Sequence, residues 1–443
     1  MKYIKKTLVL LLTIILLIVF FNYPKLNIIA GYAAKNTASS VFLANRTLAF
    51  TDSTDNNFSP IDLASNKVDT AQQIATTSAF GLLSRKAIYR EGLGAVLSLK
   101  KSDETASYAI PKRSKPDQVT PFPFGNADQK DSVFNNINYE KLHKAIAEMF
   151  HPSNKTRAVL VVYKDHIIAE KYAEGFNSNS KILGWSMTKS ITSTIFGILQ
   201  SRGVLNVQDL APIDAWKNDD RKNISIHNLL QMNSGLEWDE NYDEISDATK
   251  MLFLERDMTQ QQIHKPLVGK PNESWNYSSG TTNLLSGILR QQFNTQQDYL
   301  DFWYTELIDK IGMNSMTIET DLAGNYVGSS YAWATPRDWA KFGLLYLHRG
   351  NWNGEQLFDA SWVDYVKTPT PTSDGWYGAQ FWLNAGNRFP DVPKTMFAAN
   401  GYQGQNVYIF PENDLVIVRM GLSKNADENG FMKEVLASIN DAQ

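Results

Sequence analysis

The sequence predicts an α+β protein in which one β-sheet combines strands from distant parts of the chain. Apolar runs at residues 158–163 and 167–172 flank a polar triplet, which is typical of a β-hairpin. Two more apolar runs, residues 407–410 and 415–420, lie near the C-terminus. Helical periodicity occurs at residues 139–150, 186–202 and 431–439. A sheet that joins both ends of this region, with helices between, accounts for this order.

Composition excludes several classes of function. The chain has 443 residues, and its 43 basic and 46 acidic side chains give a net charge of -3, so nucleic acid is not an expected partner. There is no cysteine, which excludes disulfides, thiol nucleophiles and thiolate metal sites. The six histidines show no metal-binding spacing. We therefore expect neither a metal nor an organic cofactor.

Residues 1–24 resemble an export signal. Three lysines among the first six residues precede an apolar run at residues 8–21. Two interpretations remain open. A retained anchor would attach the protein to the membrane, with the rest of the chain outside the cytoplasm. Cleavage near residues 31–33, where glycine and alanine occur, would give a secreted or periplasmic protein.

Residues 25–135 form an N-terminal extension whose fold the sequence does not define. Strands are predicted at residues 41–50 and 87–99. Residues 100–130 are rich in Pro, Ser, Asp and Lys, which indicates a loop or linker. The remaining domain, residues 136–443, carries the chemical motifs.

The first motif is Ser-x-x-Lys at Ser186 and Lys189. The same pattern occurs at Ser98 and Ser178, but only Ser186 opens an amphipathic helix. A spacing of three on a helix brings the hydroxyl and the amine to one face. The helix N-terminus offers free backbone N–H groups to an oxyanion. An apolar setting favours a neutral lysine amine, which can accept the serine proton.

Two further segments add candidate residues. Tyr277 is suited to shuttle a proton to the leaving group, and Ser279 points to the same side if the segment is extended. The segment from Gly401 to Gln405 runs into a predicted strand. Its glycines allow the backbone to approach a ligand, and an edge strand there would supply a second oxyanion N–H at Gln405. Tyr402, Gln403 and Gly404 lie beside that position.

An acidic run at residues 237–244 has two interpretations. It is either a solvated loop or a lid that presents Trp238 and Tyr242 to a substrate. The sequence does not decide between them.

Together, the three ordered motifs resemble the serine β-lactamase and penicillin-binding-protein superfamily. The closer resemblance is to its class C-like branch of esterases, D-aminopeptidases and 6-aminohexanoate-dimer hydrolases, and it covers about residues 138–443. The resemblance implies an antiparallel sheet flanked by helices, with a helical region over the active site. It implies an acylated Ser186 with Lys189 as its base partner, and a catalytic Tyr277. It also implies an oxyanion hole formed by the N–H groups of Ser186 and Gln405.

Two departures from the family pattern shape the expected substrate. Ser279 stands third in the tyrosine motif, where related β-lactamases carry Asn. Tyr402-Gln403-Gly404 replaces the Lys-Thr-Gly triplet that binds the carboxylate of β-lactams and D-Ala peptides, and the nylon-oligomer hydrolases have His at the position of Gln403. We therefore expect a small ester or amide substrate without that carboxylate.

Two alternative functions remain. One is a D,D-carboxypeptidase or weak β-lactamase that acts on cell-wall peptides. The other is a non-catalytic, membrane-tethered binding or sensor module that keeps the same fold.

Overall fold

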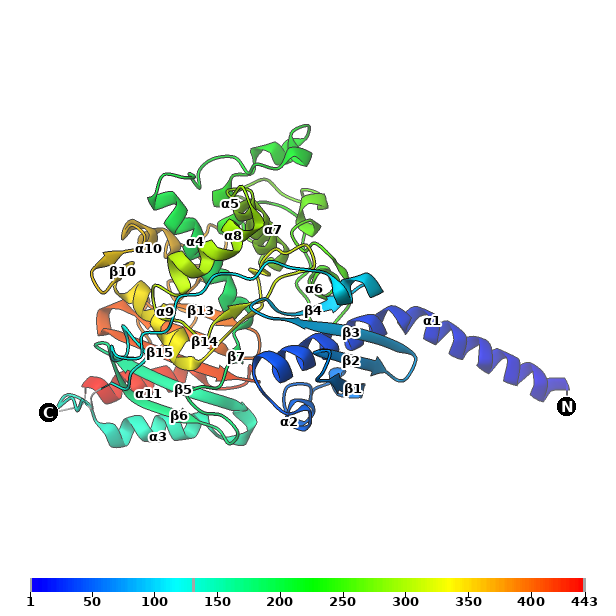
Figure 1. Cartoon of the computed structure of the whole chain (residues 1–443), viewed down its shortest axis with the longest axis horizontal. Coiled ribbons are helices and arrows are strands. Elements are labelled where there is room, and N and C mark those ends of the chain that lie inside the picture. The colour runs from blue at the N-terminus through cyan, green and yellow to red at the C-terminus, as the bar shows by residue number, and fades with distance from the viewer. Residues whose placement is uncertain (1, 130–131, 441–443) are drawn as a thin grey trace. The chain divides into compact units, whose positions relative to one another are not determined.

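The computed structural model describes residues 2–129 and 132–440, and the chain divides into two compact units (Figure 1). The first unit comprises Met1–Ser107 and Asp239–Arg256, and the second comprises Tyr108–Trp238 and Asp257–Gln443. Lys130, at the end of the predicted linker, lies outside the described residues, as do Met1 and residues 441–443.

The first unit is built from a four-stranded antiparallel sheet and a long helix. The strands lie in chain order: β1 (Ala64–Asp69), β2 (Ile74–Ala79), β3 (Leu83–Arg90) and β4 (Gly94–Ser98). The helical elements are α1 (Lys2–Ala38), η1 (Ser39–Leu43), α2 (Leu48–Ser53), η2 (Ile61–Leu63), η3 (Lys101–Thr105) and α6 (Asp247–Leu254). Short turns join neighbouring strands, so this sheet needs only local pairing.

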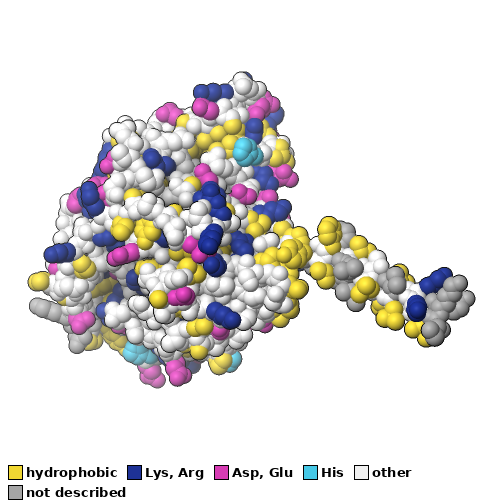
Figure 2. Space-filling model, turned by 45° about the vertical axis from the view of Figure 1, so that its right-hand side comes forward, with side chains coloured by type: hydrophobic (Ala, Val, Ile, Leu, Met, Phe, Trp, Pro, Cys, Tyr) yellow, Lys and Arg dark blue, Asp and Glu magenta, His cyan; other side chains and the backbone are white. Residues whose placement is uncertain are grey.

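Helix α1 has two parts with different environments. Its C-terminal part packs on the sheet, where Leu26, Ile29 and Ala30 form one buried cluster with Ala79. Its N-terminal part carries exposed apolar side chains from Ile4 to Tyr23, which Figure 2 shows as yellow atoms along the helix. In the described part of the chain, no helix combines the length and apolarity needed to cross a bilayer. The predicted transmembrane anchor is therefore not supported.

The strands predicted in the extension are only partly correct. The prediction for residues 41–50 is wrong, because this segment contains the end of η1, a short loop and the start of α2. The prediction for residues 87–99 is confirmed as β-structure, although it is a hairpin of β3 and β4 and not one strand. The apolar residues of the first segment fit either structure, and a short apolar run does not decide between helix and strand.

The second unit contains a six-stranded antiparallel sheet in the order β12–β13–β14–β15–β5–β6. Its strands are β12 (Trp382–Leu383), β13 (Phe397–Gly401), β14 (Gln405–Phe410), β15 (Leu415–Gly421), β5 (Thr156–Tyr163) and β6 (His166–Tyr172). The C-terminal strand β15 pairs with β5, which begins more than 250 residues earlier in the printed sequence. The predicted sheet that joins distant segments is confirmed.

Helices cover both faces of this sheet. Helices α3 (Tyr139–Met149) and α11 (Glu428–Asn440) contribute to one buried cluster with Val159, Val161 and Ile417. On the other face, Gly343 of α9 (Pro336–Leu347) approaches so closely that a Cβ there would lie 2.7 Å from Val416 Cγ1. Figure 1 shows the helices on the two sides. The predicted α+β fold, an antiparallel sheet flanked by helices, is confirmed.

The remaining elements of this unit lie outside the six-stranded sheet. The helices are η4 (Pro152–Asn154), η5 (Trp185–Met187), α4 (Thr188–Ser201), η6 (Asp214–Trp216), η7 (Asp220–Asn223), α5 (Ile226–Leu230), η8 (Gln261–His264), α7 (Ser279–Arg290), α8 (Gln296–Trp303), η9 (Tyr304–Ile308), α10 (Ser361–Val366) and η10 (Pro411–Asn413). Strands β7 (Ile182–Leu183), β9 (Ala332–Ala334) and β8 (Thr317–Ile318) form a small sheet, and β10 (Asn351–Trp352) pairs with β11 (Glu355–Gln356).

Candidate active site

Ser186 lies on a strained turn between β7 and α4. Its neighbour Trp185 has a φ of 48°, a left-handed conformation that is costly for a large side chain. Gly184 precedes it, and a Cβ at this glycine would overlap the ring of Trp339. The turn is held to β9, because Gly184 N donates to Ala332 O at 2.8 Å. The surrounding structure therefore fixes Ser186 at the start of the helical segment, as the sequence predicts.

Lys189 follows one turn later and is 1% exposed. Its Nζ donates to Ser186 Oγ at 3.1 Å, to Ser279 Oγ at 2.9 Å and to the backbone oxygen of Ser329 at 2.9 Å. The spacing of the Ser-x-x-Lys pair thus produces the contact expected from helix geometry. The structure brings Ser186, Lys189 and Ser279 together.

The tyrosine segment contacts the same lysine. Lys189 Nζ lies 4.8 Å from the ring centroid of Tyr277, which is within the range of a cation–π contact. Ser279 begins α7 and is fully buried, while Tyr277 lies half-buried in the preceding loop. The ring of Tyr277 also packs against Trp382, with centroids 5.3 Å apart. One side of the site is therefore aromatic.

The segment from Gly401 to Gln405 leads into an inner strand of the sheet, whereas the sequence predicts an edge strand. Gln405 begins β14, which pairs with β13 on one side and β15 on the other. The predicted edge strand is therefore wrong, because β14 is an inner strand. Gln405 turns its side chain into the sheet, where Nε2 donates to Gly421 O at 2.6 Å and Oε1 accepts from Gly421 N at 3.1 Å.

The end of β13 is the part of this segment that meets the nucleophile turn. A Cβ at Gly401 would overlap the carbonyl oxygen of Gly184 and lie 3.1 Å from Trp185 Cβ. The next residue, Tyr402, packs edge-on against Trp185 with ring centroids 5.8 Å apart. Lys424 Nζ lies 4.5 Å from the centroid of Tyr402. This close approach explains why glycine is required at position 401.

Gly404 makes room for the side chain of Arg419, whereas the sequence predicts that its glycine lets the backbone approach a ligand. Its φ is 79°, and a Cβ would overlap Nη1 of Arg419. The Arg419 side chain is 0% exposed. Its guanidinium donates to Gly404 O at 2.8 Å and to Asn154 O at 2.8 Å. Gln403, beside it, has a φ of 62°. Hydrogen bonds from the buried Arg419 therefore stabilise the turn between β13 and β14.

The two aromatic residues of the predicted lid fall in different units. Trp238 belongs to the second unit, is 7% exposed and packs where a Cβ of Gly280 would be, one residue after Ser279. Tyr242 belongs to the first unit, and its hydroxyl donates to Glu240 at 2.9 Å. The lid function stays a prediction.

Sequence reasoning missed the backbone carbonyl of Ser329 and the side chain that orients it. Ser329 N donates to Asn283 Oδ1 at 3.1 Å, which holds the backbone of Ser329 on the amino side of the carbonyl that faces Lys189. A carbonyl group carries no residue-type signal, so no pattern indicates it. Across residues 2–129 and 132–440, no cluster of three or more His, Asp or Glu side chains is arranged to hold a metal ion.

Comparisons with known proteins agree with this geometry. Residues 149–437 match the beta-lactamase family, which is well over half of the chain. The chain belongs to the beta-lactamase family. The predicted relation to this superfamily is confirmed, and with it the prediction of a serine hydrolase at the level of the family.

Individual relatives are distant. The 6-aminohexanoate-dimer hydrolase of Paenarthrobacter ureafaciens is 23% identical over 317 residues, which cover 65% of this chain and 78% of the relative. Among solved structures, a candidate 6-aminohexanoate-dimer hydrolase from Bacillus anthracis is 21% identical with a TM-score of 0.57, covering 74% of this chain and 88% of its own. A family VIII carboxylesterase is 13% identical with a TM-score of 0.54, covering 70% and 98%. These structures show a shared fold.

Proposed function

We propose that this protein hydrolyses an ester or amide through an acyl-enzyme at Ser186. The observation that carries the proposal is the buried Lys189 Nζ, which lies within hydrogen-bond distance of Ser186 Oγ and Ser279 Oγ. A neutral amine has two N–H groups and one lone pair. The carbonyl of Ser329 accepts only, so it takes one N–H, and Ser279 Oγ takes the other. The contact with Ser186 Oγ, which is a donated bond while Nζ is an ammonium, then joins the lone pair of the neutral amine to the Ser186 proton.

The reaction follows from this arrangement. Ser186 Oγ attacks the substrate carbonyl carbon while its proton passes to Lys189 Nζ. When the C–O or C–N bond breaks, the leaving group takes that proton through Lys189 or Tyr277. Water then attacks the acyl-enzyme, gives one proton back to Ser186 Oγ and releases the acid. Ser279 holds the amine at the position where it serves both steps.

The oxyanion hole is assigned to two backbone N–H groups. Ser186 supplies the first, as the sequence analysis predicts. For the second we replace Gln405 by Tyr402, because the Gly401–Tyr402 end of β13 meets the nucleophile turn, whereas Gln405 lies in the inner strand β14. Arg419 holds this turn in place through Gly404 O.

The proposed substrate is a small ester or amide without a carboxylate next to the scissile bond, such as a linear amide resembling a 6-aminohexanoate dimer. The missing Lys-Thr-Gly triplet supports this class. The names of the relatives, which include hydrolases of esters and amides, support it as well. Aromatic rings of Trp185, Tyr402, Tyr277 and Trp382 give the site apolar walls for an aliphatic chain.

The proposed location is outside the cytoplasm. The basic and then apolar N-terminus supports export through a signal-like segment. Fractionation of cells that express the full chain with a C-terminal tag is the test. Recovery of the protein only from the cytosol would refute export.

A fluorophosphonate probe tests the nucleophile. We expect it to label the wild type and to leave Ser186→Ala unlabelled. Ser178→Ala is the matched control, because Ser178 also begins a Ser-x-x-Lys pattern and lies in a loop outside the Lys189 contacts. Equal labelling of wild type and Ser186→Ala would contradict the assignment. Rates on short esters, D-amino-acid amides, linear amide oligomers and penicillin then separate the proposed substrate class from cell-wall peptides.

A further inference from the structure

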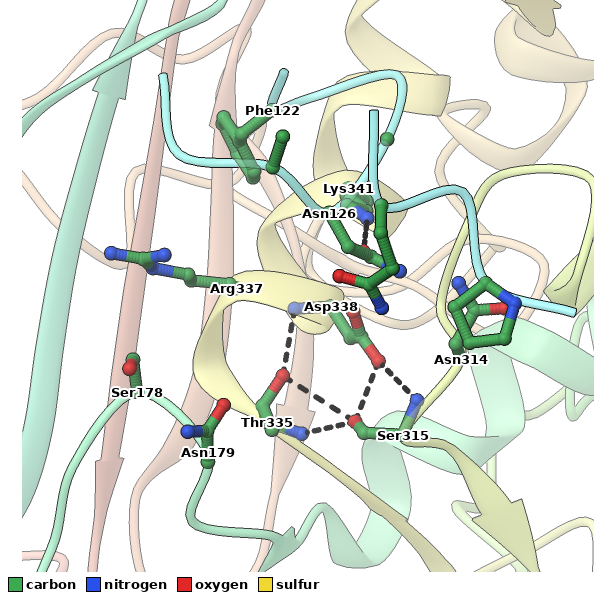
Figure 3. Close-up of a pocket in the computed structure, with 14 residues that line it drawn as sticks. Phe122, Asn126, Ser178, Asn179, Asn314, Ser315, Thr335, Arg337, Asp338 and Lys341 are labelled. Carbon is green, nitrogen blue, oxygen red and sulfur yellow. Dashed lines mark hydrogen bonds between the residues drawn. The ribbon is translucent and has the colours of Figure 1, made fainter. Parts of the chain in front are cut away.

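A cavity away from the proposed catalytic residues lies at the N-terminal end of α9, within the second unit (Figure 3). Its volume is about 290 Å³, near the lower end of the range for small-molecule sites, ~300–1,000 Å³. Four segments line it: the loop at residues 116–127, the residues that precede β7, the turn at residues 314–315, and the start of α9 at residues 335–341. Nothing in the proposed hydrolysis uses these residues.

A buried carboxylate faces this cavity. Asp338 is 5% exposed, and its Oδ2 accepts from both the backbone N and the hydroxyl of Ser315. Its Oδ1 has no hydrogen-bond partner among the described residues, and burial raises the pKa of this carboxyl group. Oδ1 is not among the fully buried atoms without a partner, so it is accessible from the cavity. A ligand with a donor group would satisfy it.

A buried ammonium lies one helical turn further along α9. Lys341 is 1% exposed, and its Nζ donates to Asn126 Oδ1 at 2.6 Å and to Gly312 O at 2.8 Å. An ammonium group has three N–H donors, so one remains without an acceptor in the described part of the chain. Burial lowers the pKa of Lys341. The cavity thus offers a ligand one acceptor, Asp338 Oδ1, and one donor, the third N–H of Lys341 Nζ.

The rest of the lining is uncharged or already paired. Arg337 donates to both carboxylate oxygens of Glu170, at 2.6 and 3.0 Å, so its charge is matched. Gln118, Asn179 and neighbouring side chains bring amide and hydroxyl groups, and Phe122 gives an apolar wall. Figure 3 shows Phe122 and Asn179 on opposite sides of the group of labelled side chains. The lining therefore carries a balanced charge and many groups that both donate and accept.

We propose that this cavity binds a neutral, polyhydroxylated ring of the size of a monosaccharide. A hydroxyl group donates and accepts at once, so it satisfies Asp338 Oδ1 and Lys341 Nζ together, which a purely cationic or anionic group does not. The amides serve further hydroxyls, and the ring's C–H face packs on Phe122. A net charge on the ligand would place a like charge beside Asp338 or Lys341.

The cavity is also connected to the nucleophile turn by short strands. Thr335 lines it and follows β9 directly, while Asn179 lines it and precedes β7. Strands β7 and β9 pair with each other, and β9 carries the Ala332 backbone groups that hold Gly184 and Thr188. The binding proposal stands independently of the proposed hydrolysis, so each can fail without the other.

Saturation-transfer NMR on the full chain with methyl β-D-glucopyranoside tests the proposal. We expect transfer to the sugar ring protons at millimolar concentration. Lys341→Met should weaken binding more than tenfold, and the double variant Gln118→Ala with Asn179→Ala should weaken it at least fivefold. The matched control Gln208→Ala removes an exposed amide elsewhere in the unit and should leave binding unchanged.

Each result either supports or overturns the site. If the buried position makes Lys341→Met unfold, the double variant decides. Its two side chains have no hydrogen bond to the described residues of the protein, so their loss leaves the fold intact. Absence of saturation transfer at 50-fold excess of sugar overturns the proposal. So does binding that the double variant leaves intact, or displacement of the sugar by equimolar glycine, which would indicate a zwitterion site.

Discussion

Substitutions at Gly404 and Arg419 should destabilise the protein in a strongly non-additive way. Gly404→Ala places a Cβ on Nη1 of Arg419 and forces alanine to a φ of 79°. The left-handed conformation costs about 1 kcal/mol. Displacing the guanidinium costs more, because it breaks charged hydrogen bonds to Gly404 O and Asn154 O, worth roughly 1.5–3 kcal/mol each.

Arg419→Met loses the same hydrogen bonds but regains the energy of burying a guanidinium, so we expect it to cost about 3 kcal/mol. Gly404→Ala alone should cost about 4 kcal/mol. In the double variant the overlap is gone, so only the backbone strain adds to the loss of arginine, and the total should again be about 4 kcal/mol. The sum of the single changes is about 7 kcal/mol, which leaves a coupling of about 3 kcal/mol.

Urea unfolding of the four proteins, followed by tryptophan fluorescence, measures this coupling. These four are the wild type, the two single variants and the double variant. A conservative Arg419→Lys variant completes the comparison and should recover part of the loss. Additivity of the two single changes to within 0.5 kcal/mol would refute the proposed contact between the glycine and the guanidinium. Hydrolysis of a short chromogenic ester should fall in parallel, because the same turn carries Tyr402.

Three other predictions concern the site and its support. Ser279→Ala should lower kcat for ester hydrolysis by about tenfold to a hundredfold while fluorophosphonate still labels Ser186, since Lys189 loses its hydrogen bond to Ser279 Oγ; unchanged kcat in steady-state assays would contradict this. Gly197→Ala should lower the free energy of unfolding by about 1–3 kcal/mol, because its Cβ would lie 2.6 Å from Trp362 Nε1; thermal melting checks this, and an unchanged Tm would refute the close packing. Burial and a nearby carboxylate raise the pKa of Asp321 to about 7. The native state then keeps a proton that the unfolded chain releases near pH 4, so the free energy of unfolding should fall as pH rises from about 4 to 7, by up to about 1.4 kcal/mol per pH unit. Asp321→Asn should flatten that decline in urea titrations at pH 5 and 8, and an unaltered slope would exclude Asp321 as its source.

The sequence predicts the local parts of this fold well. The hairpin of β5 and β6 and the helix after Ser186 follow from short-range periodicity, and both are present. The Ser186–Lys189 contact follows from helix geometry alone. The contact between Ser279 and Lys189 does not follow from local sequence, because it depends on how α4 and α7 pack although the two residues are 90 positions apart.

The parts that sequence reasoning missed depend on tertiary order. Whether β14 is an edge or an inner strand is set by the pairing of β13 and β15, which no local pattern contains. No local pattern indicates why glycine is needed at position 404 either, because the side chain that requires the space belongs to Arg419 on the neighbouring strand. A glycine signals that space is needed, but the sequence does not say whether a ligand or a side chain fills it.

The burial of α1 bears on how the N-terminus is processed. A leader peptidase needs an extended and accessible chain, whereas Ala30, Ala33 and Ala34 are helical and 0% exposed. Cutting near residues 31–33 would separate Leu26, Ile29 and Ala30 from the cluster that they form with Ala79. If the mature chain keeps this four-stranded unit folded, we expect it to retain the second half of α1, and its intact mass to include residues 26–33.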